Sequence, residues 1–294
     1  MSVFYNLSVK EVKKETKNAV SVVFEIPEKM QSEFNFIPGQ YITIQKEFEG
    51  KPYRRAYSIC SSPNVKELRV AIKEVKKGIF SVYANNKLQV GDTLEVAAPE
   101  GKFVLNTVAS NSKNYLSFVA GSGITPVLSM IKSVLENEKN SKFILVYGSK
   151  SSDETIFKKE IDNLVSKYKN QFEVHYVFSQ KISDKAYFGR INLKVINDIL
   201  KHKYNKITFD DYFLCGPEEM IDLVKETLLK KGVKKEMIHL ELFSSTSVKK
   251  EVNSDLSGNA TITIVLDEEE TTIDMRRDEI ILNVALAHDL DAPY

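Results

Sequence analysis

Two closely spaced glycines form the part of the sequence best suited to bind a ligand. Gly121 and Gly123 follow a short apolar run and precede a stretch whose apolar residues keep helical spacing up to Leu135. Glycine permits a sharp turn at positive φ and lets the backbone approach a ligand closely. We expect Thr125 to cap the helix and Pro126 to occupy its first turn. Because a helix N-terminus presents unpaired N–H groups, the pattern predicts a phosphate site, while an ordinary turn with packing glycines stays open.

A second candidate site lies on an extended segment nearer the N-terminus. Arg55 and Tyr57 are predicted to point to one face of a strand, with Ser58 on the other face or at the strand end. Arginine can hold a phosphate through two hydrogen bonds, a tyrosine ring can stack, and a serine hydroxyl can donate or accept. These residue types suit a ligand with an aromatic ring and a phosphate tail. A barrel strand with a surface arginine and a core tyrosine stays open as the alternative.

Three further segments could contribute to binding. Gly78 and Ser81 stand at the start of a short helix expected over residues 80–88, where they could seat an anion or serve only as a cap. The segment 99–103, Pro-Glu-Gly-Lys-Phe, reads by itself as a turn with an apolar anchor. Cys215 ends a predicted buried strand, and a lone cysteine is more often a small apolar side chain than a reactive thiol.

Composition narrows the classes of protein. The 294 residues are 43% apolar and 28% charged, with 41 basic and 40 acidic residues, which is typical of a globular protein and gives no support to a nucleic-acid partner. Two cysteines disfavour a disulfide framework and a thiolate metal cluster held by this chain alone. No apolar run approaches the roughly 20 residues of a membrane span, and the N-terminus lacks a signal pattern, so we expect a cytoplasmic protein.

The periodicity of the chain changes twice. Residues 1–110 carry β-type runs at 20–24, 41–44, 68–75 and 93–97 with turn signals between them, which predicts a small antiparallel Greek-key β-barrel. Residues 111–243 alternate apolar strands and helices, which predicts a doubly wound α/β domain that binds ligands at the carboxyl ends of its strands. The expected strands are 143–147, 172–178, 212–214 and 238–243, and the expected helices are 155–168, 192–200 and 218–230.

The order and spacing of these motifs resemble the ferredoxin–NADP reductase superfamily. The matching segments are Arg55-x-Tyr57-Ser58, Gly78-x-x-Ser81, Pro99-x-Gly101-x-Phe103 and Gly121-Ser-Gly-Ile-Thr-Pro126. The longer form R-R-A-Y-S-I-C-S-S-P is similar to that of the fused flavin–NAD(P)–[2Fe–2S] reductases, such as the reductases of phenylacetyl-CoA epoxidase systems. The resemblance implies a barrel that binds a flavin, expected to be FAD, and an α/β domain that binds NADPH or NADH.

The resemblance also implies roles for single residues. Arg55 would hold the flavin pyrophosphate, Tyr57 would stack on the isoalloxazine, Ser58 would bond near its N5 atom, and Gly78 and Ser81 would seat the pyrophosphate. Tyr57, Ser58, Cys215 and Glu241 would form the catalytic group, with Cys215 beside the hydride-donating carbon. The implied cofactor-binding residues are Arg55, Tyr57, Ser58, Ile72, Gly78, Phe80, Ser81, Gly121, Gly123, Thr125, Pro126, Ser149, Lys150, Cys215, Gly216, Pro217 and Phe243.

The preference between the two nicotinamide cofactors depends on the end of the second strand of this domain. Ser149 and Lys150 lie where the adenosine ribose would fall, and a hydroxyl with a cation suits a 2′-phosphate. No acid occupies 148–152, although Asp153 and Glu154 follow. The pattern favours NADPH, and a solvated surface role for Lys150 stays open. Glu241 and Phe243 also retain ordinary surface and core roles as alternatives.

The C-terminal part has a different character. Residues 244–258 are polar and predict a linker, and strands at 260–266 and 271–275 followed by a helix at 279–288 resemble the beginning of a β-grasp ferredoxin domain. In the resembling family a cysteine-rich loop for a [2Fe–2S] cluster would come next. We therefore expect residues 259–294 to be an incomplete domain of a longer parent protein. His175, His202, His239 and His288 show no spacing typical of metal ligands, so no metal site is expected.

The sequence supports one function ahead of the others. An NAD(P)H-dependent flavoprotein would pass electrons from NADPH through FAD to a [2Fe–2S] centre and on to an oxygenase or a ferredoxin-type acceptor. The alternatives are a flavin-binding module without efficient turnover, or a reductase that serves a different oxygenase or ferredoxin.

Overall fold

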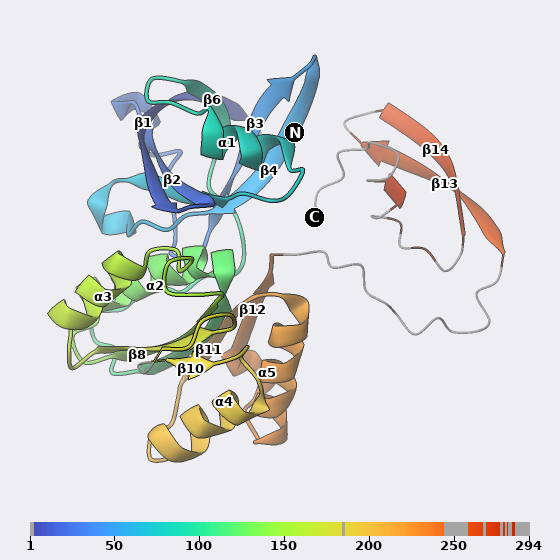
Figure 1. Ribbon diagram of the computed structural model, residues 1–294. Helices are drawn as coiled ribbons and strands as arrows, with labels where there is room; N and C mark the ends of the chain where they lie inside the picture. The colour runs from blue at the N-terminus through green and yellow to red at the C-terminus, as the bar shows by residue number, and fades with distance from the viewer. Residues whose placement is uncertain are drawn as a thin grey trace.

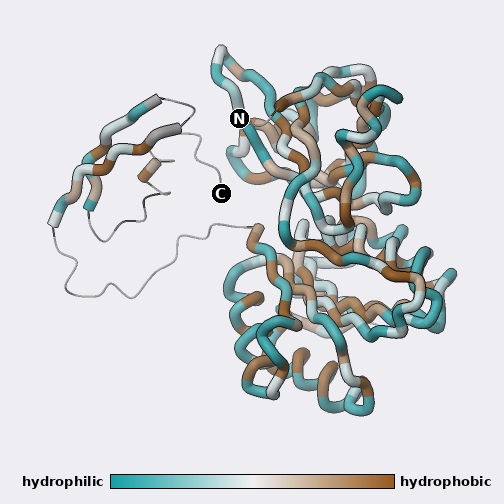
Figure 2. The backbone as a smooth tube through the Cα atoms, turned by 180° about the vertical axis from the view of Figure 1, so that it is seen from behind, coloured by the Kyte–Doolittle hydropathy of each residue, from teal (hydrophilic) through white to brown (hydrophobic). Residues whose placement is uncertain are grey.

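The protein folds into two packed units and a separate hairpin. The computed structural model describes residues 3–183, 186–243, 258–266, 269–276, 279, 281, 284 and 285. Figure 1 shows the β-rich N-terminal unit against one side of an α/β unit, with the two-stranded hairpin beside them. Figure 2 shows hydrophobic stretches along the strands in the interior of both units.

The N-terminal unit is a six-stranded antiparallel sheet with the order β4-β3-β6-β1-β2-β5. Its elements are β1 (Phe4–Thr16), β2 (Ala19–Glu25), β3 (Tyr41–Phe48), β4 (Lys51–Ser58), β5 (Leu68–Lys73), α1 (Ile79–Asn86) and β6 (Thr93–Ala97). The outer strands are brought together where the chain leaves β4, because Ile59 forms a bridge with Val70 of β5. This confirms the predicted antiparallel β architecture, and α1 begins one residue earlier than expected.

The α/β unit is a parallel sheet covered by helices on both faces. The strand order is β10-β9-β8-β7-β11-β12, and all the strand pairs are parallel. The strands are β7 (Asn114–Ala120), β8 (Lys142–Ser149), β9 (Phe172–Phe178), β10 (Tyr187–Phe188), β11 (Asp211–Gly216) and β12 (Ile238–Leu242). The helices are α2 (Ile124–Asn137), α3 (Lys158–Lys167), α4 (Leu193–Asn197) and α5 (Glu218–Lys230). Helices α2 and α3 lie on the side of the barrel, while α4 and α5 cover the opposite face (Figure 1).

The predicted helix at 192–200 is confirmed, but its hydrogen-bond pattern changes in the second half. The α-helix ends at Asn197, and Asp198–Lys203 form a π-helical turn. Apolar spacing cannot distinguish an α-helix from a π-helix here, because Val195 and Ile199 are buried on the same side of this segment in spite of the change in hydrogen bonding. The hydroxyl of Tyr187 donates to the carboxylate of Asp198 at the start of the wider turn.

A buried carboxylate anchors the connection between the two units. Glu138 follows α2 and is fully buried. It accepts hydrogen bonds from the backbone N–H of Val108 (3.0 Å), the side-chain amide of Asn111 (2.8 Å) and the hydroxyl of Tyr115 (2.9 Å). Three donors satisfy a charge that burial would otherwise penalise, so this contact fixes the path of the connecting segment.

The C-terminal hairpin is present as predicted. β13 (Asn259–Leu266) and β14 (Glu269–Arg276) pair antiparallel, with Ile273 and Met275 buried. The expected linker at 244–258 and most of the expected helix at 279–288 lie outside the described residues. Within the described part of the chain, no helix is long and apolar enough to cross a membrane.

Candidate functional site

The end of β4 carries the predicted flavin residues. Arg55 and Tyr57 pair with Ile44 and Ile42 of β3, so they share one face of the strand. The Tyr57 ring lies 5.7 Å from the ring of Phe80, at an angle of 37°. Burial raises the pKa of the Tyr57 hydroxyl, which therefore stays protonated. The guanidinium of Arg55 donates to the carbonyl of Arg54 at 2.6 Å.

The start of α1 lies beside this strand. Gly78 is the N-cap, and a Cβ there would lie only 2.5 Å from the hydroxyl oxygen of Ser81. That hydroxyl is buried and accepts a hydrogen bond from the backbone N–H of Val75 at 3.1 Å. Ser81 therefore shapes the turn, which leaves the first N–H groups of the helix to bind an anion.

The two glycines of the β7–α2 turn have different roles. Gly121 has a φ of +58°, a conformation that favours glycine. A Cβ on Gly123 would lie 2.3 Å from the carbonyl oxygen of Cys215, so this glycine allows the turn to pack against the end of β11. The packing interpretation therefore applies to Gly123, and the phosphate site at Gly121 stays a prediction.

The expected cap at Thr125 is wrong. A 3₁₀ turn at residues 121–123 leads directly into α2, which begins at Ile124, so Thr125 lies inside the first turn. Its hydroxyl donates to the carbonyl of Ser122 at 3.0 Å. Pro126 occupies the first turn as expected, where its missing N–H costs no hydrogen bond.

The end of β11 is closely packed against the glycine turn. The Cys215 side chain is fully buried, and burial raises the pKa of its thiol, which opposes a nucleophilic role. Gly216 has a φ of +150°, and a Cβ there would lie 3.1 Å from the backbone nitrogen of Ala120. Pro217 caps α5.

One hydrogen bond joins β4, the strand that carries the predicted flavin residues, to the edge of the parallel sheet where β11 and β12 end. The hydroxyl of Ser58 donates to the carboxylate of Glu241 at 3.5 Å, although the two residues are 183 positions apart. Glu241 pairs with Cys215 between β12 and β11. Burial raises the pKa of Glu241 to about 7, so near neutral pH this carboxyl is protonated in part of the molecules. Three of the four predicted catalytic residues therefore lie together at the seam between the units.

Both residues of the expected 2′-phosphate site, Ser149 and Lys150, already contact other side chains. The Ser149 hydroxyl lies 2.6 Å from the Thr155 hydroxyl, and Lys150 forms an exposed ion pair with Glu154 at 3.4 Å. The sequence did not single out Lys73, at the end of β5. Its ammonium nitrogen lies 3.5 Å from the position of a Cβ on Gly121. Only tertiary contact between the units reveals this residue.

Partial burial and the neighbouring charge of Lys150 lower the pKa of Lys73. The two lysines therefore flank the glycine turn, one from each unit. The remaining predicted residues lie nearby or in the core: Phe243 follows β12 and is partly exposed, while the side chain of Ile72 is fully buried inside the barrel.

Two histidines have ordinary hydrogen-bond partners. His175 Nε2 lies 2.6 Å from the Tyr204 hydroxyl, and burial lowers the pKa of His175 to about 4. His239 Nε2 lies 3.0 Å from the Asp211 carboxylate. Among the described residues, no group of three or more potential ligands gathers in a way that could hold a metal ion.

Comparisons with known proteins agree with this geometry. Residues 6–105 match the oxidoreductase FAD-binding domain, and residues 118–226 match the oxidoreductase NAD-binding domain. The chain is 36% identical to a subunit of the 1,2-phenylacetyl-CoA epoxidase of Escherichia coli (strain K12), across 100% of this chain and 83% of that protein. The chain belongs to the ferredoxin reductase-type NAD(P)H flavoprotein oxidoreductases.

Other members of this family share most of the chain. The ferredoxin reductase component of the 3-ketosteroid-9-alpha-monooxygenase of Rhodococcus rhodochrous is 30% identical over 98% of this chain and 81% of that protein. The FAD/NAD-binding domain of a nitric oxide dioxygenase from Vibrio cholerae O1 biovar El Tor superposes with a TM-score of 0.72 and 25% identity, over 83% of this chain and 99% of that one. A ferredoxin NADP+ reductase from Neisseria gonorrhoeae has a TM-score of 0.69 and shares the fold at 21% identity, over 82% of this chain and 99% of that one.

The residues present fit both cofactors of the family. The absent Cβ of Gly78 and the N-terminus of α1 leave backbone N–H groups for a pyrophosphate beside Arg55. Gly121 has a left-handed backbone conformation and lies beside Lys73, so a second phosphate could bind at the start of α2.

The raised pKa of Glu241 predicts a pH-dependent stability. Between pH 4.5 and pH 7 the folded protein keeps a proton that the unfolded chain has lost, so wild-type stability falls as pH rises through this window. Glu241→Gln removes this decrease of stability with rising pH, because glutamine does not ionise. In urea unfolding of nucleotide-free protein, the free energy of unfolding of the variant relative to wild type should rise by on the order of 2 kcal/mol from pH 5 to pH 8. The exposed Glu236→Gln is the control, and an equal difference at both pH values for Glu241→Gln would contradict the assignment.

Proposed function

We propose that the protein takes a hydride from NADPH onto FAD and delivers the electrons singly to an iron–sulfur acceptor that serves an oxygenase. The observation that carries the proposal is the Ser58–Glu241 contact, which brings the predicted flavin strand against the end of β11 and β12. A flavin at the end of β4 and a nicotinamide at the end of β11 would therefore meet at one seam. Family membership supports the same interpretation.

FAD would supply the chemistry, because a flavin accepts a two-electron hydride and can release single electrons. The protein binds and orients it. Arg55 and the first N–H groups of α1 would hold the pyrophosphate, and Tyr57, packed on Phe80, would stack on the ring. Ser58 would face the reacting edge of the ring, with its hydroxyl oriented by Glu241. The raised pKa of Glu241 lets it hold a proton at this edge near neutral pH.

The nicotinamide cofactor would lie across the carboxyl edge of the parallel sheet. Its pyrophosphate would bind at the glycine turn between Lys73 and α2, and its nicotinamide would approach Gly216 and Pro217. Lys150 would bind the 2′-phosphate and so favour NADPH, after exchange of its exposed pair with Glu154. NADH would lack that contact.

The nature of the relatives supports an oxygenase as the final acceptor. They include a subunit of phenylacetyl-CoA epoxidase, the reductase component of a ketosteroid monooxygenase, and the reductase subunit of a glycine betaine monooxygenase from Pseudomonas aeruginosa. The hairpin β13–β14 is consistent with the beginning of a β-grasp ferredoxin domain, through which a [2Fe–2S] centre would receive the electrons. A phenylacetyl-CoA epoxidase is the acceptor we propose, and a cytoplasmic location stays a prediction from composition.

Anaerobic reduction tests this function directly. The purified chain loaded with FAD should be yellow, and its visible flavin bands should bleach on addition of NADPH. Steady-state oxidation of NADPH with ferricyanide as acceptor should then proceed, because this acceptor bypasses the iron–sulfur centre. Bound flavin without NADPH oxidation would favour the non-catalytic flavin module, and a chain that takes up no flavin would reject both.

Arg55→Ala should weaken FAD retention by roughly 10- to 100-fold, because the pyrophosphate loses a charged partner. Flavin fluorescence released during dilution measures the dissociation constant. Arg54→Ala, one residue away on the opposite face of β4, is the matched control. Equal loss of FAD from both variants would argue against a specific role for Arg55.

The two lysines should affect the two nicotinamide cofactors differently. Lys150→Gln should raise the KM for NADPH about 10-fold and leave that for NADH nearly unchanged, because only NADPH has the 2′-phosphate. Lys73→Gln should raise both KM values, because the pyrophosphate is common to both. Glu154→Gln, which frees Lys150, should not raise the KM for NADPH. An equal effect of Lys150→Gln on both cofactors would contradict the assignment.

A further inference from the structure

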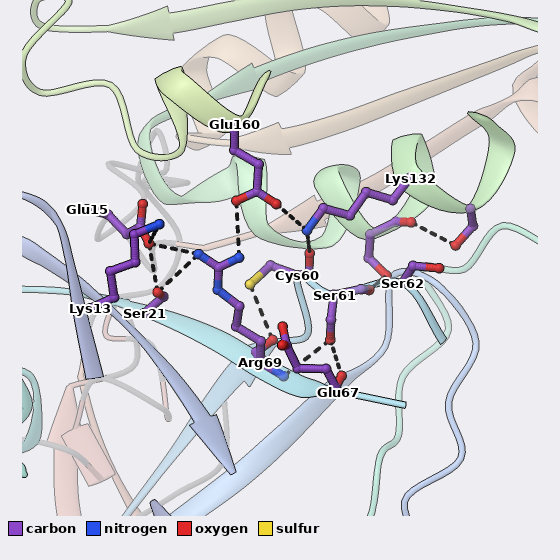
Figure 3. Close-up of polar contacts among 12 residues, drawn as sticks. Lys13, Glu15, Ser21, Cys60, Ser61, Ser62, Glu67, Arg69, Lys132 and Glu160 are labelled. Atoms are coloured by element: carbon purple, nitrogen blue, oxygen red, sulfur yellow. Dashed lines mark hydrogen bonds and ion pairs between the residues drawn. The ribbon is translucent and has the colours of Figure 1, made fainter. Parts of the chain in front are cut away.

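Four charged side chains from both units meet in a cluster at their interface (Figure 3). They are Glu15 and Arg69 of the barrel, and Lys132 and Glu160 of the α/β unit. None belongs to the binding sites described above. Their side chains are between 7% and 26% exposed, which is unusual for charged residues.

Arg69 on β5 is the centre of the cluster. Its Nη2 donates to the Glu15 carboxylate at 2.8 Å and to the Ser21 hydroxyl at 3.2 Å. Its Nη1 donates across the interface to the Glu160 carboxylate at 3.1 Å. The guanidinium also lies 4.9 Å from the ring centre of Phe157, which immediately precedes α3. Arg69 therefore contacts the α/β unit in two ways, because its guanidinium pairs with the Glu160 carboxylate and also lies over the Phe157 ring.

Glu160 is shared between two cations. Its second oxygen lies 2.6 Å from the ammonium of Lys132, which also donates to the carbonyl of Cys60 at 2.9 Å. The neighbouring charges of Lys132 and Arg69 lower the pKa of Glu160 despite its burial, so it is ionised. Two carboxylates face two cations within the cluster, and the half-exposed Lys13 adds a third cation 3.5 Å from Glu15, so each charge has a partner of opposite sign.

The cluster touches the segments that carry both proposed cofactor sites. Cys60 lies two residues after Ser58 on the continuation of the flavin strand. Lys132 lies on α2, whose N-terminus follows the glycine turn. Glu160 lies in the first turn of α3, after the loop that carries Ser149 and Lys150.

Apolar packing at this interface gives little directional control. Small barrel side chains, Ala19, Cys60 and Ala71, join the apolar core of the α/β unit together with Phe103 and Leu105, which follow the barrel. Hydrophobic burial is non-directional and scales with area, so it constrains the relative orientation of the two units less than hydrogen-bonded ion pairs do.

We propose that the Glu15–Arg69–Glu160–Lys132 cluster is an interdomain lock that positions the hydride donor against the flavin. Arg69, Lys132 and Glu160 are positioning residues, because they act through the orientation of the two units. The inference rests on the proposed hydride transfer, and it assigns to these side chains a part in the rate of that step. FAD binding uses residues of the barrel and stays unchanged when the lock opens, while NADPH binding, which Lys73 and the Gly121 turn share across the interface, changes less than the rate of hydride transfer.

Glu160→Gln tests the lock with a change of charge at constant shape. In anaerobic stopped-flow reduction of the FAD-loaded chain, the limiting rate at saturating NADPH should fall about 10- to 100-fold, because small misalignment of reacting atoms has effects of this size. The NADPH concentration at half-saturation should change less than about 3-fold. The primary isotope effect with NADPH deuterated at the transferred position should rise. Glu226→Gln, in an exposed ion pair on α5, is the matched control.

Hydrogen exchange gives a readout independent of activity. Backbone amides of residues 60–69 and of 157–161 should lose protection together in Glu160→Gln, while those of the sheet strand β8 keep theirs. If wild-type protein binds FAD but is not reduced by NADPH, the proposed function fails, and this exchange result still decides whether the cluster holds the two units. Unchanged exchange in both segments would overturn the lock.

A second variant separates positioning from stability. Replacing the cluster with Glu15→Gln, Arg69→Met, Lys132→Met and Glu160→Met leaves none of the four positions charged, and Lys13, which loses its pair with Glu15, is half exposed, so folding should survive. We expect this variant to retain FAD and a cooperative thermal transition while its hydride-transfer rate stays low. A wild-type rate in this variant or in Glu160→Gln overturns the proposal. So does a rate loss in Glu160→Gln that is matched by an equal loss of bound FAD.

Discussion

A row of hydrogen bonds connects α2 of the α/β unit to the segment that follows β4 in the barrel. The Ser129 hydroxyl donates to the carbonyl of Ser61 at 2.6 Å, and the Lys132 ammonium donates to that of Cys60 at 2.9 Å. The Glu136 carboxylate accepts from Ser62 and from Asn64. The segment thus bound continues the strand that bears Arg55, Tyr57 and Ser58. Helix α2, which begins after the Gly121 turn, is therefore hydrogen-bonded along its length to the segment that follows β4.

This arrangement needs close approach of backbones, which explains the glycines at the seam. A Cβ on Gly39 would lie 2.0 Å from the carbonyl oxygen of Phe103, and one on Gly123 would lie 2.3 Å from that of Cys215. Such distances exclude any side chain without movement of the backbone. The ring of Phe103 packs edge-on against Phe213 at 5.8 Å, so the turn that ends the barrel is also part of the core of the α/β unit. The segment 99–103, which reads alone as an ordinary turn, acquires this role from its neighbours.

Buried charge in this protein has two distinct consequences. Glu138 and Glu160 are buried with donors or cations around them, and they hold segments in place. Glu241 is partly buried and accepts one long hydrogen bond from Ser58, and burial raises its pKa. The same side-chain type therefore holds segments in place at two positions and has a raised pKa at a third, according to how well its environment replaces water.

The sequence by itself determined the order of the units, the strand and helix types, and the motifs at the strand ends, because local periodicity and glycine placement encode them. It singled out Arg55, Tyr57, Ser58 and the Gly121 turn as candidate binding residues from residue chemistry and spacing, and these roles stay predictions. It misplaced the start of α2 and missed the π-helical turn, since hydrogen-bond registers differ there without a change in apolar spacing. Only the tertiary structure placed Lys73 against Gly121, Glu241 against Ser58, and Arg69 against Glu160. These contacts join residues from 48 to 183 positions apart, and no local pattern reports the relative orientation of the two units.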